Sequence, residues 1–184
     1  MTDFKETPSQ TAGPYVHIGC VPFVCGLEPR QFGSMLGQKL VEKDAVGELI
    51  SLEITVLDGA GDPVRDVLIE IWQADPDGGY AGYPRFHYWA RQSGDFETGV
   101  ARFETLKPGN SDGTAPHILV WIAARGINLG LTTRIYFPEE PNDGDATFAL
   151  AGERANTMLA EPIKGGYKHS IYLQGANETV FFDV

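Results

Sequence analysis

The sequence predicts an all-β protein: an antiparallel β-sandwich with an irregular N-terminal arm, long aromatic-rich loops and little helix. Three observations lead to this prediction. Apolar and polar residues alternate in about seven short segments, which is typical of strands that bury one face. The 22 glycines and 12 prolines are spread along the 184 residues and separate these segments as turns do. Helical periodicity is weak throughout.

The first predicted strand covers residues 49–57, where Ile50, Leu52, Ile54 and Val56 share one face. The sequence Asp58-Gly59-Ala60-Gly61 follows as a turn. The further strands are predicted, in chain order, at 67–72, 100–106, 118–124, 131–137, 169–174 and 179–182. Short helices are compatible with residues 30–36 and 153–160. Strands of this number and length favour a sandwich or barrel whose core lies between the inward faces.

The chain is expected to form a single domain over residues 1–184. Residues 1–47 are interpreted as an irregular N-terminal arm, and its apolar side chains, such as Phe23, need a surface to cover them. We expect that surface to belong to the same domain or to a partner subunit. Residues 74–99 form a second long segment and are dense in aromatic side chains. Long loops in a compact domain usually serve function or contact a partner.

Charge and composition exclude several classes of protein. The formal net charge is −11, which argues against a nucleic-acid surface and against attraction to anionic membranes. No apolar run is long enough for a membrane span, and the first residues lack the apolar segment of a signal peptide. Cys20 and Cys25 are too few for a disulfide framework, so reduced thiols and a cytoplasmic location are expected, although a bridge between them is compatible with their spacing.

The histidines give no independent metal signal. All four are isolated in the sequence, and no His-x-His, His-x-x-x-His or Cys-x-x-Cys pair supplies two ligands from one element. His117 begins a predicted strand, where a hydrogen-bonded structural histidine is the simpler interpretation. No Gly-x-Ser-x-Gly nucleophile elbow and no glycine-rich phosphate loop are present.

Arg134 is the most informative charged residue. In strand 131–137 it shares a face with Thr132 and Tyr136, while the alternate positions form an apolar face. A guanidinium flanked by hydroxyl groups on an open sheet face matches the two oxygens of a carboxylate. A solvent-facing arginine or an ordinary salt bridge is equally compatible with the same pattern.

Several motifs resemble those of the intradiol ring-cleaving dioxygenases. The resemblance runs in order from residue 7 to the C-terminus, and several motifs in one order are far more specific than any single one. The motifs are TPSQTAGPY at 7–15, IEIWQAD at 69–75, LKPG at 106–109, APHI at 115–118, the stretch at 124–137 and ETVFFD at 178–183.

The resemblance implies a β-sandwich and a non-haem Fe(III) held by two tyrosinates and two histidines, because hard phenolate oxygen suits ferric iron. This chain departs from that ligand set. His117 matches one ligand position, but Leu119 replaces the second histidine. The tyrosine expected after Gly109 is missing, because Asn110 and Ser111 follow. The other tyrosine position falls within 80–88, where the loop length prevents an assignment. We therefore expect neither a metal nor a catalytic residue in this chain.

This departure is similar to the alpha chains of the heteromeric family members that act on protocatechuate. By that resemblance, the chain pairs with a beta subunit that binds the non-haem Fe(III), in a hetero-oligomer of several αβ pairs. The implied reaction is cleavage of 3,4-dihydroxybenzoate by O2 to 3-carboxy-cis,cis-muconate. Thr11, Gly13, Pro14 and Arg134 are the implied substrate-binding residues, and the chain alone is expected to be inactive.

Two other hypotheses remain open from the sequence. A stand-alone dioxygenase would need an unusual ligand set, such as Tyr80 or Tyr88 together with His117. A β-sandwich binding module that retains the fold without catalysis would need no metal at all. Metal content distinguishes a stand-alone dioxygenase from the subunit hypothesis. The presence of a beta-chain partner distinguishes a binding module from the subunit hypothesis.

Overall fold

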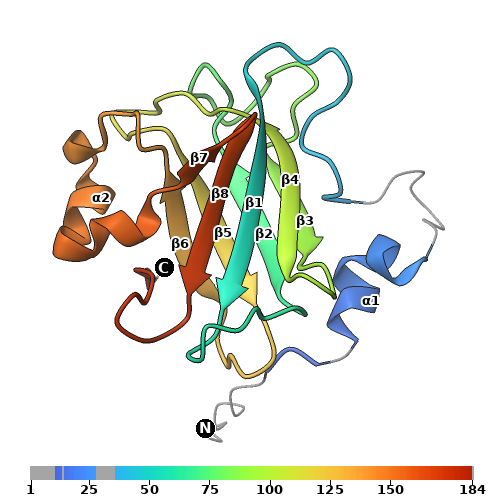
Figure 1. Cartoon of the computed structure of the whole chain (residues 1–184). Helices are drawn as coiled ribbons and strands as arrows, with labels where there is room; N and C mark the ends of the chain where they lie inside the picture. The colour runs from blue at the N-terminus through green and yellow to red at the C-terminus, as the bar shows by residue number, and fades with distance from the viewer. Residues whose placement is uncertain (1–10, 14, 28–35, 184) are drawn as a thin grey trace, which may run out of the picture.

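The computed structural model describes residues 11–13, 15–27 and 36–183. Two four-stranded sheets pack face to face, and loops and short helices surround them (Figure 1). The sheet orders are β4-β1-β8-β7 and β3-β2-β5-β6. The strands are β1 Leu49–Leu57, β2 Leu68–Gln73, β3 Trp89–Ser93, β4 Val100–Leu106, β5 His117–Ala123, β6 Leu131–Tyr136, β7 Glu161–Ile163 and β8 Gly166–Tyr172. The predicted β-sandwich is confirmed.

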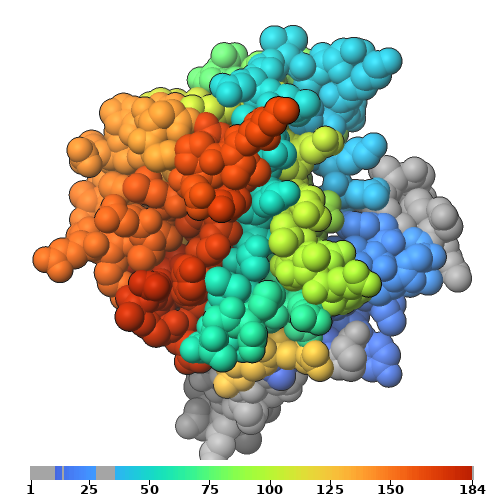
Figure 2. Space-filling view, viewed as in Figure 1, coloured from blue at the N-terminus to red at the C-terminus, as the bar shows by residue number. Residues whose placement is uncertain are grey.

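Pairing within the two sheets is mostly antiparallel. β1 pairs antiparallel with β4 and parallel with β8, so that Leu52 lies opposite Phe103 on one side and Tyr167 on the other. The remaining pairs between the described strands are antiparallel. Figure 2 shows β4, β1 and β8 side by side on the outer face of the first sheet. The sheet β4-β1-β8-β7 is therefore a mixed sheet, because β1 and β8 run parallel. The alternation of apolar and polar residues does not reveal this direction.

The main core lies between the two sheets. Alternate residues of each central strand point inward, as the period of 2 requires. Each fully buried Leu or Ile side chain contributes about 1.5–3 kcal/mol of transfer free energy. The side chains with no exposed surface include Leu52, Ile54, Val56, Ile69, Ile71, Ile118, Val120, Ile122 and Ile135.

Helices are short and lie outside the sheets. The α-helices are α1 Val16–Cys20 and α2 Ala146–Leu150, and the 3₁₀ helices are η1 Pro22–Cys25, η2 Asn142–Gly144 and η3 Gly152–Met158. The predicted helix at 153–160 is thus a 3₁₀ helix, and α1 and η1 lie within the arm predicted as irregular. Most of the predicted helix at 30–36 falls outside the described residues.

A second apolar cluster covers the outer face of β6. Tyr136 of β6 packs there with Phe148 of α2 and Met158 of η3, and all three are buried. The expectation of an open face along this strand is therefore wrong for Tyr136 and for Thr132, which is also buried. The sequence between β6 and β7 folds back over the strand end, a tertiary contact that strand periodicity does not encode.

Three strand predictions need correction. Residues 179–182 form no strand, because Phe182 makes one isolated bridge with Thr132 and the ladder does not continue. β3 was missed inside the predicted loop 74–99, since its sequence Trp-Ala-Arg-Gln-Ser lacks aliphatic alternation. The three-residue strand β7 was also missed.

The cysteines Cys20 and Cys25 are free thiols, as expected. In the part of the chain that the structure describes, no helix has the length and apolar character needed to cross a membrane.

His169 is a titratable group on the inward face of β8. Its Nδ1 lies 3.1 Å from the carbonyl oxygen of Leu159, to which it donates, and its Nε2 has no hydrogen-bond partner among the described residues. Burial lowers the pKa of His169 to about 4. The neutral imidazole is therefore the form that the folded chain accommodates.

We expect acid to destabilise the fold through His169. Its folded pKa lies below the 6.5 of an ordinary imidazole, so the unfolded chain binds the proton more readily. The stabilisation is complete above pH 6.5 and is lost as the pH falls toward 4, at a cost on the order of 3 kcal/mol. Urea unfolding across this range checks it. His169→Asn, which keeps a donor near Leu159, should unfold with a shallower pH dependence, and an unchanged dependence would contradict the assignment.

Candidate functional site

The outer face of the β3-β2-β5-β6 sheet brings the candidate residues into one row. The strand register places Trp89 opposite Trp72, Trp72 opposite Leu119, and Leu119 opposite Arg134. This row crosses all four strands and ends on the guanidinium of β6. His117 lies two residues before Leu119 on the same face of β5 and pairs with Tyr136.

Aromatic side chains are unusually exposed on this face. Trp72 is 42% exposed and Trp121 is 36% exposed. The ring of Tyr80 stacks on Trp72, with centroids 6.1 Å apart and planes inclined by 6°. Large exposed aromatic side chains that gather on one sheet face indicate a surface that meets another molecule. The face thus combines apolar contact area with two cations, Arg91, which is paired with Glu70, and Arg134 at the other end of the row.

A hydrogen-bonded chain leads from the guanidinium of Arg134 into the protein. Nη1 of Arg134 donates to the hydroxyl of Tyr136 at 3.2 Å, and this hydroxyl donates to Oδ1 of Asp145 at 3.2 Å. Nη1 also lies 3.9 Å from Oδ1 of Asp145. The Asp145 side chain is fully buried, whereas that of Arg134 is 23% exposed. The cation therefore reaches the surface while its anchors lie inside.

The carboxylate of Asp145 also caps the N-terminus of α2 and holds the backbone just before β5. Asp145 is the N-cap of α2, where it accepts hydrogen bonds from the amides of Thr147 at 2.8 Å and Phe148 at 3.1 Å. Its Oδ2 accepts from the amide of Ala115 at 3.0 Å. The carbonyl of Ala115 in turn accepts from Nδ1 of His117 at 2.8 Å. One buried carboxylate thus organises the surroundings of both Arg134 and His117.

Burial and charge hold His117 in its neutral form. Burial is the main cause that lowers the pKa of His117, and the nearby positive charge of Arg134 lowers it further. Because Nδ1 donates to Ala115, the unprotonated nitrogen is Nε2. His117 is therefore one neutral imidazole beside a fixed cation.

These residues do not fit a ferric ion. Leu119, on the same face as His117, offers an alkyl group, which cannot ligate a metal. The charged group across from it is the cationic Arg134, whereas Fe(III) needs anionic oxygen donors. The carboxylate of Asp145 is saturated by hydrogen bonds within the chain. Nowhere in the described ranges do three or more His, Cys, Asp or Glu side chains gather in a metal-binding group.

The tyrosines of the 80–88 loop lie in different surroundings. The hydroxyl of Tyr83 donates to the carbonyl of Val46 at 3.0 Å, and that of Tyr88 donates to Oδ2 of Asp75 at 3.1 Å. Both hydroxyls are thus engaged within the chain. Tyr80 instead lies over Trp72 on the outer face of the sheet. Among these three, Tyr80 is the tyrosine that shares this face with His117.

The residues of the arm lie away from Arg134. The hydroxyl of Thr11 donates to the carbonyl of Ala124 at 3.2 Å and accepts from the amide of Gly126 at 2.9 Å, beyond the end of β5. Ala124 is five residues from Leu119, which pairs with Arg134, so about 16 Å of strand separates the two places. A Cβ added at Gly13 would meet no atom of the described part of the chain within 4 Å. Pro14 lies outside the described residues.

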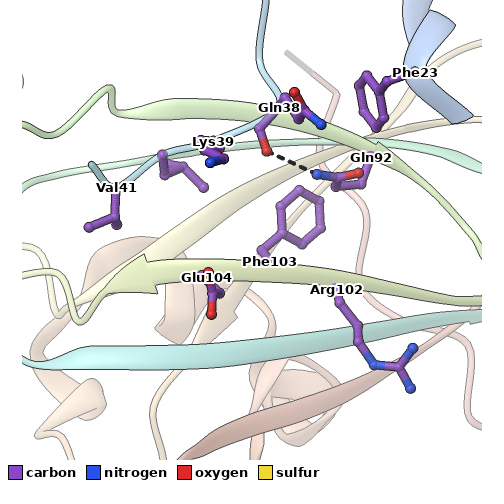
Figure 3. A pocket seen from close by; sticks show the side chains of 9 residues that line it. Phe23, Gln38, Lys39, Val41, Gln92, Arg102, Phe103 and Glu104 are labelled. Atoms are coloured by element: carbon purple, nitrogen blue, oxygen red, sulfur yellow. Dashed lines mark hydrogen bonds between the residues drawn. The ribbon is translucent and has the colours of Figure 1, made fainter. Parts of the chain in front are cut away.

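A separate cavity lies on the opposite edge of the sandwich from Arg134. It has a volume of about 260 Å³ and is lined by Phe23, Gln38 and Phe103 among others (Figure 3). Nε2 of Gln92 donates to the carbonyl of Gln38 at 3.1 Å across it. Because β2 and β5 separate its edge strand β3 from β6, this cavity does not belong to the Arg134 face.

Sequence reasoning identified Arg134, His117 and Leu119 but not Asp145. A local signal was present, since an Asp directly before the helix Ala146–Leu150 is a preferred N-cap. Nothing in the sequence pattern shows that the same carboxylate reaches Ala115 and Tyr136, because that requires the tertiary fold.

Several solved structures that align with this chain are dioxygenases, among them an intradiol ring-cleavage dioxygenase from Tetranychus urticae. The dioxygenase domain of a dioxygenase and carbohydrate-binding protein fusion from Streptomyces sp. SirexAA-E aligns with a TM-score of 0.56 and 26% identity, covering 91% of this chain and 96% of the other. A 3-chlorocatechol 1,2-dioxygenase from Rhodococcus opacus 1CP aligns with a TM-score of 0.54 and 20% identity, covering 78% and 68%. The second likeness shows the fold alone. The fold class is that of the intradiol ring-cleavage dioxygenases.

Comparison of the amino-acid sequence with those of known proteins identifies a family within this fold class. No protein-family model matches the chain. The protocatechuate 3,4-dioxygenase alpha chain of Pseudomonas putida is 40% identical, with 97% of this chain and 96% of the relative covered. The alpha chain of Burkholderia cepacia is 36% identical over the full length of both, and the beta chain of that organism is 34% identical over 74% of this chain and 68% of its own. The chain belongs to the family of protocatechuate 3,4-dioxygenase alpha chains.

Proposed function

We propose that this chain is the iron-free alpha subunit of a protocatechuate 3,4-dioxygenase. Together with a beta subunit that binds Fe(III), it forms the site at which O2 cleaves the ring of 3,4-dihydroxybenzoate between the two hydroxyl-bearing carbons. Both atoms of O2 are incorporated into the product, 3-carboxy-cis,cis-muconate. Full-length similarity to alpha chains, in a chain where Leu119 and Arg134 stand beside His117, is the observation that carries the proposal.

The outer face of the β3-β2-β5-β6 sheet supports a subunit contact. Trp72 and Trp121 are exposed there in the single chain, and burying aromatic side chains is a main source of interface free energy. The match to a beta chain of the same fold supports a partner of similar shape. The arm is a second candidate contact, because Tyr15 and Ile18 are exposed on it.

The substrate's carboxylate explains why an arginine is needed. The chain carries a formal net charge of −11, which repels an anion on average. Arg134 offers a local, permanently charged donor at the end of the aromatic row, and its planar guanidinium matches a carboxylate. We propose that Arg134, with Thr11, Gly13 and Pro14 of the arm, borders the substrate pocket in the assembled enzyme.

The open space beside Gly13 supports the role of the arm. No atom of the described residues lies within 4 Å of the place where a Cβ of residue 13 would stand, so another molecule can approach the backbone closely there. Thr11 anchors the arm to the loop after β5 through two hydrogen bonds. We place the enzyme in the cytoplasm, in keeping with the free thiols of Cys20 and Cys25.

Reconstitution tests the proposed function. The chain, a co-expressed beta chain and their complex are each assayed for O2 uptake with 3,4-dihydroxybenzoate. We expect the two chains to co-purify, uptake by the complex and none by this chain alone. Failure to bind a beta chain, with the fold intact by circular dichroism, would contradict the proposal and favour a binding module without catalysis. Uptake by this chain alone would instead favour a stand-alone dioxygenase.

A further inference from the structure

We propose that Tyr136 and Asp145 are positioning residues that hold the guanidinium of Arg134 in one orientation on the outer face of the sheet. The substrate's carboxylate would then meet a cation that is already ordered. This inference rests on the proposed function, in which Arg134 borders the substrate pocket. It adds two residues that touch no substrate themselves and act through Arg134.

The geometry links the three side chains in sequence. Arg134 and Tyr136 are two residues apart on β6 and therefore project from the same face. The Tyr136 hydroxyl accepts from Nη1 of Arg134 and donates to Oδ1 of Asp145, both at 3.2 Å. The cross-strand neighbour of Arg134 is Leu119, whose alkyl group cannot orient a guanidinium. Tyr136 is thus the polar contact that fixes the head of the arginine.

The anchoring side chains are buried and packed, whereas an arginine side chain is flexible unless contacts hold it. The Tyr136 side chain is fully buried, and its ring packs edge-on against Phe148 with centroids 5.0 Å apart. Asp145 is held by the amides of Ala115, Thr147 and Phe148. An arginine side chain has several rotatable bonds, and ordering them costs free energy when a ligand binds. Contacts with a buried tyrosine and carboxylate supply that order before binding.

The tyrosine keeps the proton that this chain of contacts requires. Burial raises the pKa of Tyr136 to about 12, so its hydroxyl stays protonated at neutral pH. A protonated hydroxyl can accept from Arg134 and donate to Asp145 at the same time. The buried carboxylate stabilises the cation at 3.9 Å without reaching the surface, where it would repel an anionic ligand.

The first test reads the order of Arg134 without any activity. Full chain and Tyr136→Phe are treated with phenylglyoxal, and the modification rate of each arginine is followed by peptide mass spectrometry. Loss of the hydroxyl should raise the rate at Arg134 roughly three- to tenfold, the range that one lost hydrogen bond allows. Arg102, an exposed arginine on the other sheet, is the internal control and should not change. An unchanged rate at Arg134 would overturn the proposal.

The second test is a double-mutant cycle in the complex with the beta chain. Tyr136→Phe retains the packed ring and should raise KM for 3,4-dihydroxybenzoate roughly three- to tenfold with kcat unchanged. In an Arg134→Ala background the same change should have no further effect on KM. An equal effect in both backgrounds would overturn the positioning role. Faster modification of Arg134 with unchanged KM in every variant would support the anchoring but overturn the place of Arg134 in the substrate pocket.

Discussion

Replacing Asp145 by alanine is expected to lower the free energy of unfolding by roughly 3–5 kcal/mol. The carboxylate is fully buried and accepts from Tyr136, Ala115 and two amides of α2. Its removal leaves these donors without a partner and also removes the N-cap of the helix, which alone costs about 1 kcal/mol. Urea unfolding of the variant and the parent chain measures the difference.

Two further variants separate the carboxylate from the local backbone. Asp145→Asn keeps the shape and one acceptor, and we expect a loss of roughly 2 kcal/mol. Asp143→Ala, an exposed acid in η2 two residues earlier, should change stability by less than about 0.5 kcal/mol. A loss below about 1 kcal/mol for Asp145→Ala would mean that the network around Asp145 contributes little to the fold.

Replacing Arg134 by alanine is expected to have the largest effect on the assembled enzyme. A hydrogen-bonded charge pair contributes about 1.5–3 kcal/mol, so KM for 3,4-dihydroxybenzoate should rise roughly 10- to 150-fold. Iron content and co-purification with the beta chain should stay unchanged, because Arg134 lies at the end of the row and its side chain reaches the surface. Steady-state kinetics with metal analysis measures both.

Two control variants accompany Arg134→Ala, one at a different arginine and one that keeps the charge at position 134. Arg102→Ala removes an exposed arginine that pairs with Glu53 on the other sheet, and KM should not change. Arg134→Lys keeps the charge but loses the planar fork, so a partial rise in KM is expected. Loss of co-purification in Arg134→Ala would reassign this residue to the subunit interface rather than to the substrate.

The strands were predictable where alternation is strong and not elsewhere. Residues 49–57 and 100–106 alternate over their full length and form β1 and β4 with the expected bounds. β3 was hidden because its stability comes from pairing with β2 rather than from its own apolar pattern. Apolar and polar residues alternate in 179–182, but this segment pairs with β6 only through one isolated bridge between Phe182 and Thr132. In each failure, the deciding contact joins segments that are far apart in the sequence.

For the candidate site, the residues that share a sheet face were predictable, whereas their burial and tertiary contacts were not. The strand pattern places Arg134 and Tyr136 on one face, and the motifs place His117 and Leu119 together, as the structure does. The burial of Tyr136 and the role of Asp145 were not predictable, because α2 and η3 fold back over β6 through contacts that no local pattern contains. That Thr11 and Arg134 border one pocket remains a prediction, since within this chain they lie at separate places.

Iron content tests the central claim most directly. Iron per chain and the visible absorption of tyrosinate–Fe(III) are measured for this chain alone and for its complex with a beta chain. We expect iron and colour in the complex and neither in this chain alone, because Leu119 stands where the ligand set requires a histidine and the cationic Arg134 lies opposite it. Stoichiometric iron and colour in this chain alone would contradict it.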